Sequence, residues 1–382
     1  MTGAAGILAP ELEDLLAVVA EQAAAAAADV DRNARFPAEA VRALRETGLI
    51  TAIAPRELGG LGLGLPALVR VAEQLARRCG STAMIWAMHQ TQLACLVRHH
   101  PRSAVLPEAV AEGWLIASVT SERGVGGDLR SSRTSLLDGA AGGLTLEKAG
   151  TTVSYGADAD AYLVTARRSA DAQSGSQVAV LVTREQVELE QQGSWDVLGM
   201  RGTCSAAFRL RAAFGADQVL PVPFRTVAAA TMVPVSHLLW AGVWTGLAAE
   251  AVRRAAGAAR LRAGTDPAAE VPELGRAHAK LLGLRGQLGA AVQAVEPAYE
   301  AGREPTLGLG AQLNALKVAA SEGVLEIAQL ALQICGMAGF AEHGRHSVAR
   351  ILRDAHSAPL MIGNGRLLAA NARTVLLSRG ER

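Results

Sequence analysis

The sequence is poor in aromatic side chains, which make up only 3% of its 382 residues. A chain with so few large rings must fill its interior with small aliphatic side chains, and half of its residues are hydrophobic. This composition favours close packing of helix against helix, in one large domain or in two to three smaller ones.

An excess of charge of either sign is also missing. The formal net charge is +1, and the sequence contains no basic arm. Because a surface that follows nucleic-acid phosphates needs clustered Lys and Arg side chains, nucleic acid is not expected as a partner.

Cysteines are few, and their spacing argues against structural zinc and against a disulfide framework. The four residues form neither CxxC pairs nor a Cys/His ligand pattern: Cys79, Cys95, Cys204 and Cys335. His99 and His100 have no third ligand at helical spacing, so no metal site is expected. The sequence shows neither the pattern of a signal peptide nor a stretch of 18 uncharged apolar residues, so we expect a cytoplasmic protein without a membrane span.

Hydrophobic periodicity predicts an α+β multi-domain protein with three parts. Residues 1–114 show helical spacing interrupted by Pro and Gly, which predicts an N-terminal all-α domain. Residues 115–226 carry short alternating runs such as SQVAVLVTRE and predict a middle β domain of the barrel or sandwich type. Residues 227–382 predict a C-terminal four-helix bundle, with helices near 235–262, 271–300, 308–335 and 358–378. This order differs from the strand–helix alternation of a doubly wound nucleotide-binding sheet.

Six short segments resemble motifs of one known family, in the same order along nearly the whole chain. They are VTSERGVGGD (119–128), TVSYGADADAYLVTAR (152–167), LGMRGTCS (198–205), LRAAFGADQVLPVPF (210–224), QICGMAG (333–339) and RILRDAH (350–356). Each is weak alone, because short Gly-containing motifs recur by chance. Together they are similar to the acyl-CoA dehydrogenase family of flavoproteins, and this resemblance implies the same three-domain fold with FAD as cofactor.

The resemblance places the flavin ring beside two of these segments. Ser121 stands where the family has a Thr that hydrogen-bonds the ring, and Ser154 stands where a Thr hydroxyl meets flavin N5. Thr152 replaces the family's Trp, which removes an aromatic shield from one face of the ring. The further flavin-binding positions implied by these segments are Ser118, Val119, Gly126, Gly127 and Val153. Taken alone, the GVGGD run is more typical of a hairpin loop, although glycine amides also suit the flavin's pyrophosphate.

Two other segments imply that FAD is shared between subunits. In the family, the turn that resembles QICGMAG receives the adenosine half of FAD from a neighbouring subunit, which would involve Gln333 and Gly336 here. Arg262 corresponds to an Arg that meets the pyrophosphate, but the Phe and Gly that follow it in the family are missing. The resemblance therefore implies a homodimer or homotetramer, whereas a glycine-terminated helix end would explain Gly336 by itself.

The family's catalytic carboxylate is missing from both of its known positions. Alignment on Arg353-Asp354-Ala355 places Ile362 where the family usually has the Glu that removes the α proton of an acyl thioester. Some members carry this base on another helix, and there Ser236 takes its place. A positioned base contributes about 10²- to 10⁴-fold in rate, and neither side chain can supply it.

His237 is the remaining candidate for acid–base chemistry, because it follows Ser236 and a neutral imidazole can accept a proton at physiological pH. A lone His among Leu, Trp and Val is more often a hydrogen-bonded core residue. We therefore keep both interpretations of His237 open.

Three functions fit these residues. The first is α,β-dehydrogenation of an acyl thioester, bound to CoA or to a carrier protein, with hydride transfer to flavin N5. The second is a flavin-dependent monooxygenase on the same fold, which needs no α-proton base and acts on another small-molecule substrate. The third is a catalytically degenerate flavoprotein that serves as a partner subunit.

Overall fold

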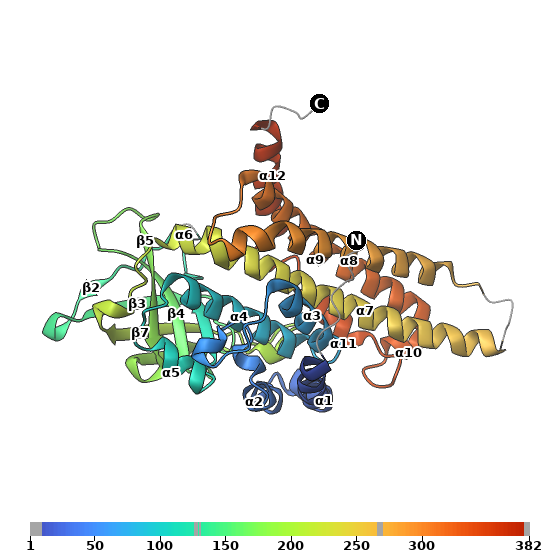
Figure 1. Cartoon of the computed structure of the whole chain (residues 1–382). Coiled ribbons are helices and arrows are strands. Elements are labelled where there is room, and N and C mark those ends of the chain that lie inside the picture. Colours follow the sequence, from blue (N-terminus) through green and yellow to red (C-terminus); the bar gives the residue numbers. More distant parts are fainter. Residues whose placement is uncertain (1–9, 126–128, 130, 266–269, 378–382) are drawn as a thin grey trace.

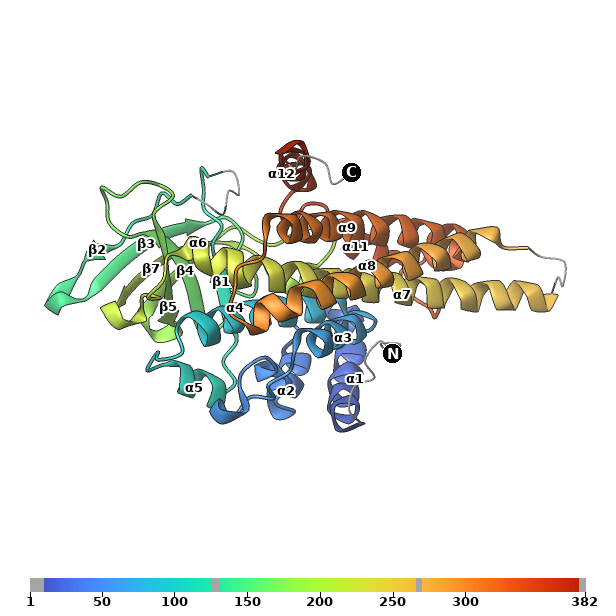
Figure 2. The same cartoon turned by 45° about the horizontal axis from the view of Figure 1, so that its top comes forward.

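The computed structural model describes residues 10–125, 129, 131–265 and 270–377, and it shows the predicted order of helices, strands and helices. The β region forms one end of the molecule, and long helices extend from it toward the other end (Figure 1). The N-terminal helices and the last helix lie on opposite sides of a central helical layer in both views (Figure 2). The α+β architecture predicted from the sequence is confirmed.

From Pro10 onward, where the description of the chain begins, five α-helices precede the strands: α1 (Pro10–Asn33), α2 (Ala38–Glu46), α3 (Leu65–Ala76), α4 (Gly80–His99) and α5 (Leu106–Ala111). The apolar residues of α1 recur on one face, so only that face is buried. In contrast, nearly every residue of α4 is buried, because this helix lies inside the molecule between α3, α7 and β1.

The middle region consists of two packed sheets. One has the order β1 (Ile116–Val119), β4 (Ala161–Arg167) and β5 (Gln177–Thr183), and the other has the order β2 (Leu137–Asp138), β3 (Leu144–Gly150), β7 (Ala207–Phe214) and β6 (Val187–Gln192). The strands β4 and β5 are buried on both faces, whereas β7 alternates between buried and exposed side chains. The second sheet therefore has one face in water.

The C-terminal region contains the long helices α7 (Val233–Thr265), α8 (Pro272–Glu300) and α9 (Leu307–Cys335), which begin and end within three residues of the predicted bounds. Shorter helices are α6 (Phe224–Val227), α10 (Met337–Phe340), α11 (Ala349–Ala355) and α12 (Asn364–Leu377). A π-helical turn, Ala228–Met232, joins α6 to α7.

The fourth predicted helix of the bundle differs from the prediction. It begins at Asn364 rather than near residue 358, and it packs on α9 while projecting away from the other helices (Figure 1). Its apolar side chains explain this position, because Leu367 is buried but most of the others, including Leu368, Val375 and Leu376, are exposed. The place beside α7 is taken by α3.

Two glycines allow α3 and α7 to pack closely. A Cβ at Gly246 would lie 2.2 Å from the carbonyl oxygen of Glu73, and a Cβ at Gly242 would lie 3.1 Å from that of Val69. At 100° per residue, these glycines share one face of α7, and His237, Trp240 and Trp244 share the opposite face. The close contact with α3 therefore fixes where α7 presents its aromatic face.

The segments LGMRGTCS and RDA connect the three regions. The main-chain N–H of Met200 donates to Asp354 Oδ1 at 2.6 Å, and a Cβ at Gly199 would lie 2.1 Å from the carbonyl oxygen of Arg353. Arg353 also forms an ion pair with Asp31 at the end of α1. These two motifs thus hold the domains together, and burial raises the pKa of the Asp354 carboxyl to about 6.

Two described stretches, Phe224–Gly264 and Leu307–Cys335, are long and apolar enough to cross a membrane by length and composition alone. In the most apolar 18-residue part of each stretch, 72% of the first and 50% of the second is buried inside the fold. The core helices of a soluble protein pass the same test, so this observation is weak evidence for a membrane span.

Candidate functional site

The predicted flavin-binding hydroxyls lie together at one rim of the β region. The main-chain N–H of Thr152 donates to Ser121 Oγ at 3.1 Å, and Ser121 donates in turn to the carbonyl oxygen of Thr152 at 2.9 Å. Ser118 Oγ lies 3.2 Å from Thr120 Oγ1 at the end of β1. Val119 is fully buried, so only its main chain can reach a ligand. The structure therefore brings the segments 118–121 and 152–154 together, as the resemblance implies.

Ser154 ends a chain of hydroxyl groups that the sequence did not reveal. Ser205 donates to Ser154 Oγ at 2.8 Å, and Thr203 Oγ1 lies 2.8 Å from Ser205 Oγ. Thr203 also hydrogen-bonds to the carbonyl oxygen of Met200. When Ser205 donates to Ser154, the Ser154 proton is available to a ligand, and Thr203 then directs its single proton to Ser205 rather than to the Met200 carbonyl. The adjacent main-chain N–H of Val153 already donates to the carbonyl oxygen of Ala206. The Ser154 hydroxyl is therefore the group of this turn that can hydrogen-bond to a ligand.

The loop after β1 is anchored by a buried carboxylate. Glu122 accepts from the hydroxyl of Ser132 and from the main chain and hydroxyl of Thr134, and it lies 3.6 Å from the buried Nζ of Lys148. These contacts explain the Glu of this motif as a structural residue. The predicted positions Gly126 and Gly127 lie outside the described residues.

Arg262, Gln333 and Gly336 gather at the opposite end of the helical layer, near the ends of α7 and α9. Burial raises the pKa of the Cys335 thiol. The positive charge of Arg262 is close enough to oppose this shift in part. Gly336 has a φ of 58°, which suits glycine at this turn. Within one chain these three residues are not brought to the rim that carries Ser121 and Ser154, so their role in cofactor binding stays a prediction.

Neither expected base position carries an acid in the structure. Ser236 Oγ donates to the carbonyl oxygen of Val233 within its own helix. Ile362 lies in the turn before α12 with a φ of 49°, a conformation that β-branched residues rarely adopt. Backbone strain of this kind is concentrated at functional sites. The strained turn at Ile362 is therefore a candidate part of the site, although it lacks the family's carboxylate.

Lys317 on α9 holds the turn that contains Ile362. Its fully buried ammonium donates to the carbonyl oxygens of Ala358 (3.2 Å) and Ile362 (3.0 Å) and to Asn364 Oδ1 (2.8 Å). No carboxylate forms an ion pair with Lys317 in the part of the chain that the structure describes, and burial lowers its pKa to about 8. The acidic side chain of this neighbourhood, Glu322, is exposed and accepts from Asn364.

The aromatic face of α7 borders this ammonium. Lys317 Nζ lies 5.5 Å from the ring centroid of Trp244, which is 6.4 Å from Trp240, and the Trp240 ring is 6.1 Å from that of His237. Both ring nitrogens of His237 and both indole N–H groups are buried without a hydrogen-bond partner among the described residues. Buried polar atoms are nearly always satisfied, so these groups are available to a hydrogen-bonding partner that the described part of this chain does not supply.

Both interpretations of His237 stay open in the structure. It is 1% exposed, as a core residue would be, and its ring nitrogens meet no partner at full hydrogen-bond geometry, although the main chain of Leu313 is a hydrogen-bonding neighbour of the ring. Burial, followed by the charge of Lys317, lowers its pKa to about 4, although the nearby main chain of Leu313 works against this shift. His237 is therefore neutral near pH 7, and its role as a base stays a prediction.

Comparisons with known proteins agree with this arrangement. Residues 12–104 match the family model "Acyl-CoA dehydrogenase, N-terminal domain", and residues 226–373 match "Acyl-CoA dehydrogenase, C-terminal domain". The chain belongs to the acyl-CoA dehydrogenase family. The family named from the sequence motifs is thus confirmed, and its α–β–α fold is the fold observed here.

Several similar proteins are nitrososynthases or monooxygenases by name. L-evernosamine nitrososynthase from a Micromonospora species is 30% identical over 91% of this chain and 85% of its own. The structure of a nitrososynthase from Micromonospora carbonacea var. africana has a TM-score of 0.83 and 25% identity, covering 98% of this chain and 100% of its own. The dibenzothiophene monooxygenase TdsC of Paenibacillus sp. A11-2, solved with FMN, has a TM-score of 0.84 at 23% identity over 96% and 98% of the two chains, which shows the fold alone.

Lys317, Ser205 and the partnerless indoles of α7 were not predicted from the sequence. A lysine inside an apolar helical stripe was the available signal for Lys317, since buried lysines are rare. Among the described residues, no group of three or more His, Cys, Asp or Glu side chains could hold a metal ion.

Proposed function

We propose that the protein is a flavin-dependent monooxygenase that transfers one oxygen atom to the amino nitrogen of a small molecule. The observation that carries this proposal is the absence of an acid at both base positions, where Ile362 and Ser236 stand. Acyl thioester dehydrogenation requires removal of an α proton. Oxygen transfer to a nitrogen lone pair does not. The nitrososynthase names of two relatives support a nitrogen substrate.

The residues at the rim of the β region fit a flavin. The Ser154 hydroxyl is free to donate or to accept at N5, and the paired Ser121 and Thr152 present polar atoms beside it. Bound reduced flavin would supply the activation of molecular oxygen. The overall reaction balances, because one oxygen atom goes to the nitrogen and the other leaves as water with two hydrogens from the reduced flavin.

The charge around α7 favours an uncharged amine, which is the reactive form. The Lys317 ammonium is buried and forms no ion pair among the described residues, with Glu322 as the nearby opposite charge, so it disfavours a second positive charge beside it. Neutral His237 can accept the proton that the nitrogen loses, and the indole N–H groups of Trp240 and Trp244 can donate to oxygen atoms of the substrate. The chain's own groups thus bind and orient the substrate and take up its proton.

We infer further that the cofactor is FAD and that it is shared between subunits of a homodimer or homotetramer. The distance between the Ser154 rim and the end of the bundle that carries Gln333 and Gly336 supports this inference, as does the exposed apolar surface of α12. Binding titrations with FAD and FMN test it together with light scattering. Equal affinity for both flavins in a monomeric protein would contradict it.

The test of function supplies the purified protein with flavin, a flavin reductase, NADH and oxygen. We expect amines to gain one oxygen atom by mass spectrometry, and we expect no bleaching of oxidised flavin when acyl thioesters are added anaerobically. Ser154→Ala should lower oxygen transfer by about 10²-fold, the scale for loss of a preorganised hydrogen-bonding group. Ser169→Ala, which changes a half-buried serine after β4, away from the proposed flavin rim, is the matched control. Anaerobic bleaching by an acyl thioester would establish the dehydrogenase instead, and no reaction in either assay would indicate a degenerate partner subunit.

A further inference from the structure

A pocket opens between the N-terminal helices and the β region. It lies on the other side of the 204–206 segment from Ser154. Its volume is about 530 Å³, within the usual range of small-molecule sites. Cys204 and Ala206 line it, whereas Ser205 between them bonds to Ser154. None of the predicted flavin-binding residues lines this pocket, so the proposed function leaves it unexplained.

The charged groups of the pocket are both acidic. Asp196 forms an ion pair with Arg201 at 3.2 Å, so its charge is compensated. Asp158 has no hydrogen bond or ion pair to its carboxylate among the described residues, and no Lys, Arg or His belongs to the lining. The pocket therefore carries one uncompensated negative charge, which disfavours phosphorylated and other anionic ligands.

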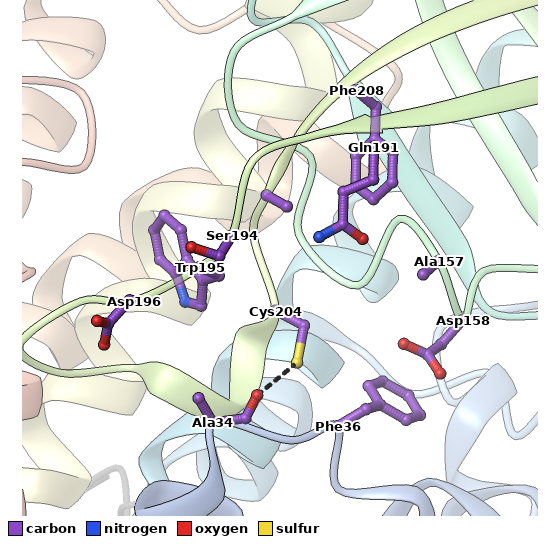
Figure 3. A pocket seen from close by; sticks show the side chains of 11 residues that line it. Ala34, Phe36, Ala157, Asp158, Gln191, Ser194, Trp195, Asp196, Cys204 and Phe208 are labelled. Atoms are coloured by element: carbon purple, nitrogen blue, oxygen red, sulfur yellow. Dashed lines mark hydrogen bonds between the residues drawn. The ribbon is translucent and has the colours of Figure 1, made fainter.

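Partial desolvation by the protein raises the pKa of Asp158, although the residue is exposed through the mouth of the pocket. Burial raises the pKa of the Cys204 thiol to about 11, and the negative charge of Asp158 contributes to this shift. The Asp158 carboxylate is thus directed into the same space that Cys204 borders, as Figure 3 shows.

Three aromatic side chains line the same pocket as this carboxylate. Phe36 lies on its side of the pocket and Trp195 on the other, with Phe208 above them in the view of Figure 3. The Trp195 indole is held in place, because its Nε1 donates to the carbonyl oxygen of Met200 at 3.2 Å. Aromatic faces attract organic cations, and a carboxylate among them adds a direct counter-charge.

The main chain of the pocket is held in a strained conformation on two sides. Ala34 has a φ of 47° and Cys204 a φ of 44°, and the Cys204 thiol donates to the carbonyl oxygen of Ala34 at 3.5 Å. Non-glycine residues persist in this conformation only where the surrounding structure imposes it, and such positions are concentrated at ligand sites. The fold thus maintains the shape of this pocket.

From this geometry we propose that the pocket is a binding site for a small organic ammonium compound, with the cation between Asp158 and the rings of Phe36 and Trp195. The apolar remainder of the ligand lies against Phe208. This site is separate from the proposed flavin rim and does not depend on the reaction assigned there.

The experiment measures binding by isothermal titration calorimetry, with and without flavin, to four probes of similar size. Phenethylamine and benzyltrimethylammonium represent the cation, 3-phenylpropanol is the neutral analogue and 3-phenylpropanoate is the anion. We expect both cations to bind at least tenfold more tightly than the alcohol, and no binding of the anion. Added salt should weaken the cations alone.

Matched variants locate the site. Asp158→Asn should weaken cation binding by at least tenfold, whereas Asp196→Asn changes the compensated carboxylate of the same pocket and should alter it less than twofold. Trp195→Leu should weaken the cations more than the alcohol. Equal binding of cation and alcohol, or unchanged binding to Asp158→Asn, would overturn the proposal. Because these measurements need no turnover, their failure is distinct from failure of the proposed oxygenation.

Discussion

Two glycine substitutions on neighbouring helices should change stability in opposite directions. Gly246→Ala adds a Cβ that would lie 2.2 Å from the Glu73 carbonyl oxygen and 2.8 Å from Ala76 Cβ on α3. Ordinary contacts begin near 3.4 Å, so α3 and α7 must separate by about 1.2 Å. Overpacking of a core costs about 1–3 kcal/mol, and a backbone collision belongs at the upper end of that range.

Helix propensity opposes this cost but does not outweigh it. Alanine is favoured over glycine by about 1 kcal/mol inside a helix, which leaves a net loss of about 2 kcal/mol for Gly246→Ala. Gly286 lies in the exposed middle of α8, and an added Cβ there meets nothing within 4 Å. Gly286→Ala therefore keeps the propensity gain and should stabilise the protein by up to about 1 kcal/mol.

Urea unfolding followed by tryptophan fluorescence measures both changes, with the transition midpoints compared at an unchanged slope. Gly246→Ala should also lower oxygen transfer, because the opposite face of α7 carries His237, Trp240 and Trp244. The reasoning is refuted if Gly246→Ala is as stable as the parent protein, or if Gly286→Ala loses as much stability as Gly246→Ala.

Three further predictions concern buried polar groups. The folded pKa of Asp354 is raised to about 6 from 3.8, so the folded protein binds more protons between these values and the stability contributed by this group falls as pH rises through that window. Asp354→Asn, which keeps an acceptor for the Met200 N–H, should flatten this part of a pH–stability curve. His237→Leu removes a buried imidazole whose nitrogens have no hydrogen-bond partner at full geometry, so it should raise the free energy of unfolding by about 1 kcal/mol in urea titrations while it lowers oxygen transfer. A loss of stability would show that the main chain of Leu313 satisfies the ring. Lys317→Met should speed amide hydrogen exchange by at least about tenfold in residues 358–364, and unchanged exchange there would show that Lys317 does not hold this turn.

The sequence determined the order and extent of the main elements. Helical spacing predicted α7, α8 and α9 within three residues at each end, and alternation predicted β5 from SQVAVLVTRE. Local patterns are sufficient for α8 and α9 because each buries a stripe that its own residues define, whereas β5, which is buried on both faces, was recognised from its short run of alternating β-branched residues. The motif order also identified the family, whereas the replacement of the catalytic acid by Ile362 stays a prediction from the motif alignment.

Only the tertiary structure decided which residues meet. Lys317 and Ile362 are 45 positions apart in the sequence, and no periodic pattern predicts that the ammonium holds the turn. The partnerless state of His237 depends on what packs around its ring, and the separation of Gly336 from Ser154 depends on the direction of α7 and α9. Likewise, only the fold brings Phe36, Trp195 and Phe208 from distant segments to the pocket that Asp158 lines, and only the fold leaves that lining without a basic side chain. Hydrogen bonding, burial and charge pairing arise between elements, so a linear pattern of residues cannot contain them.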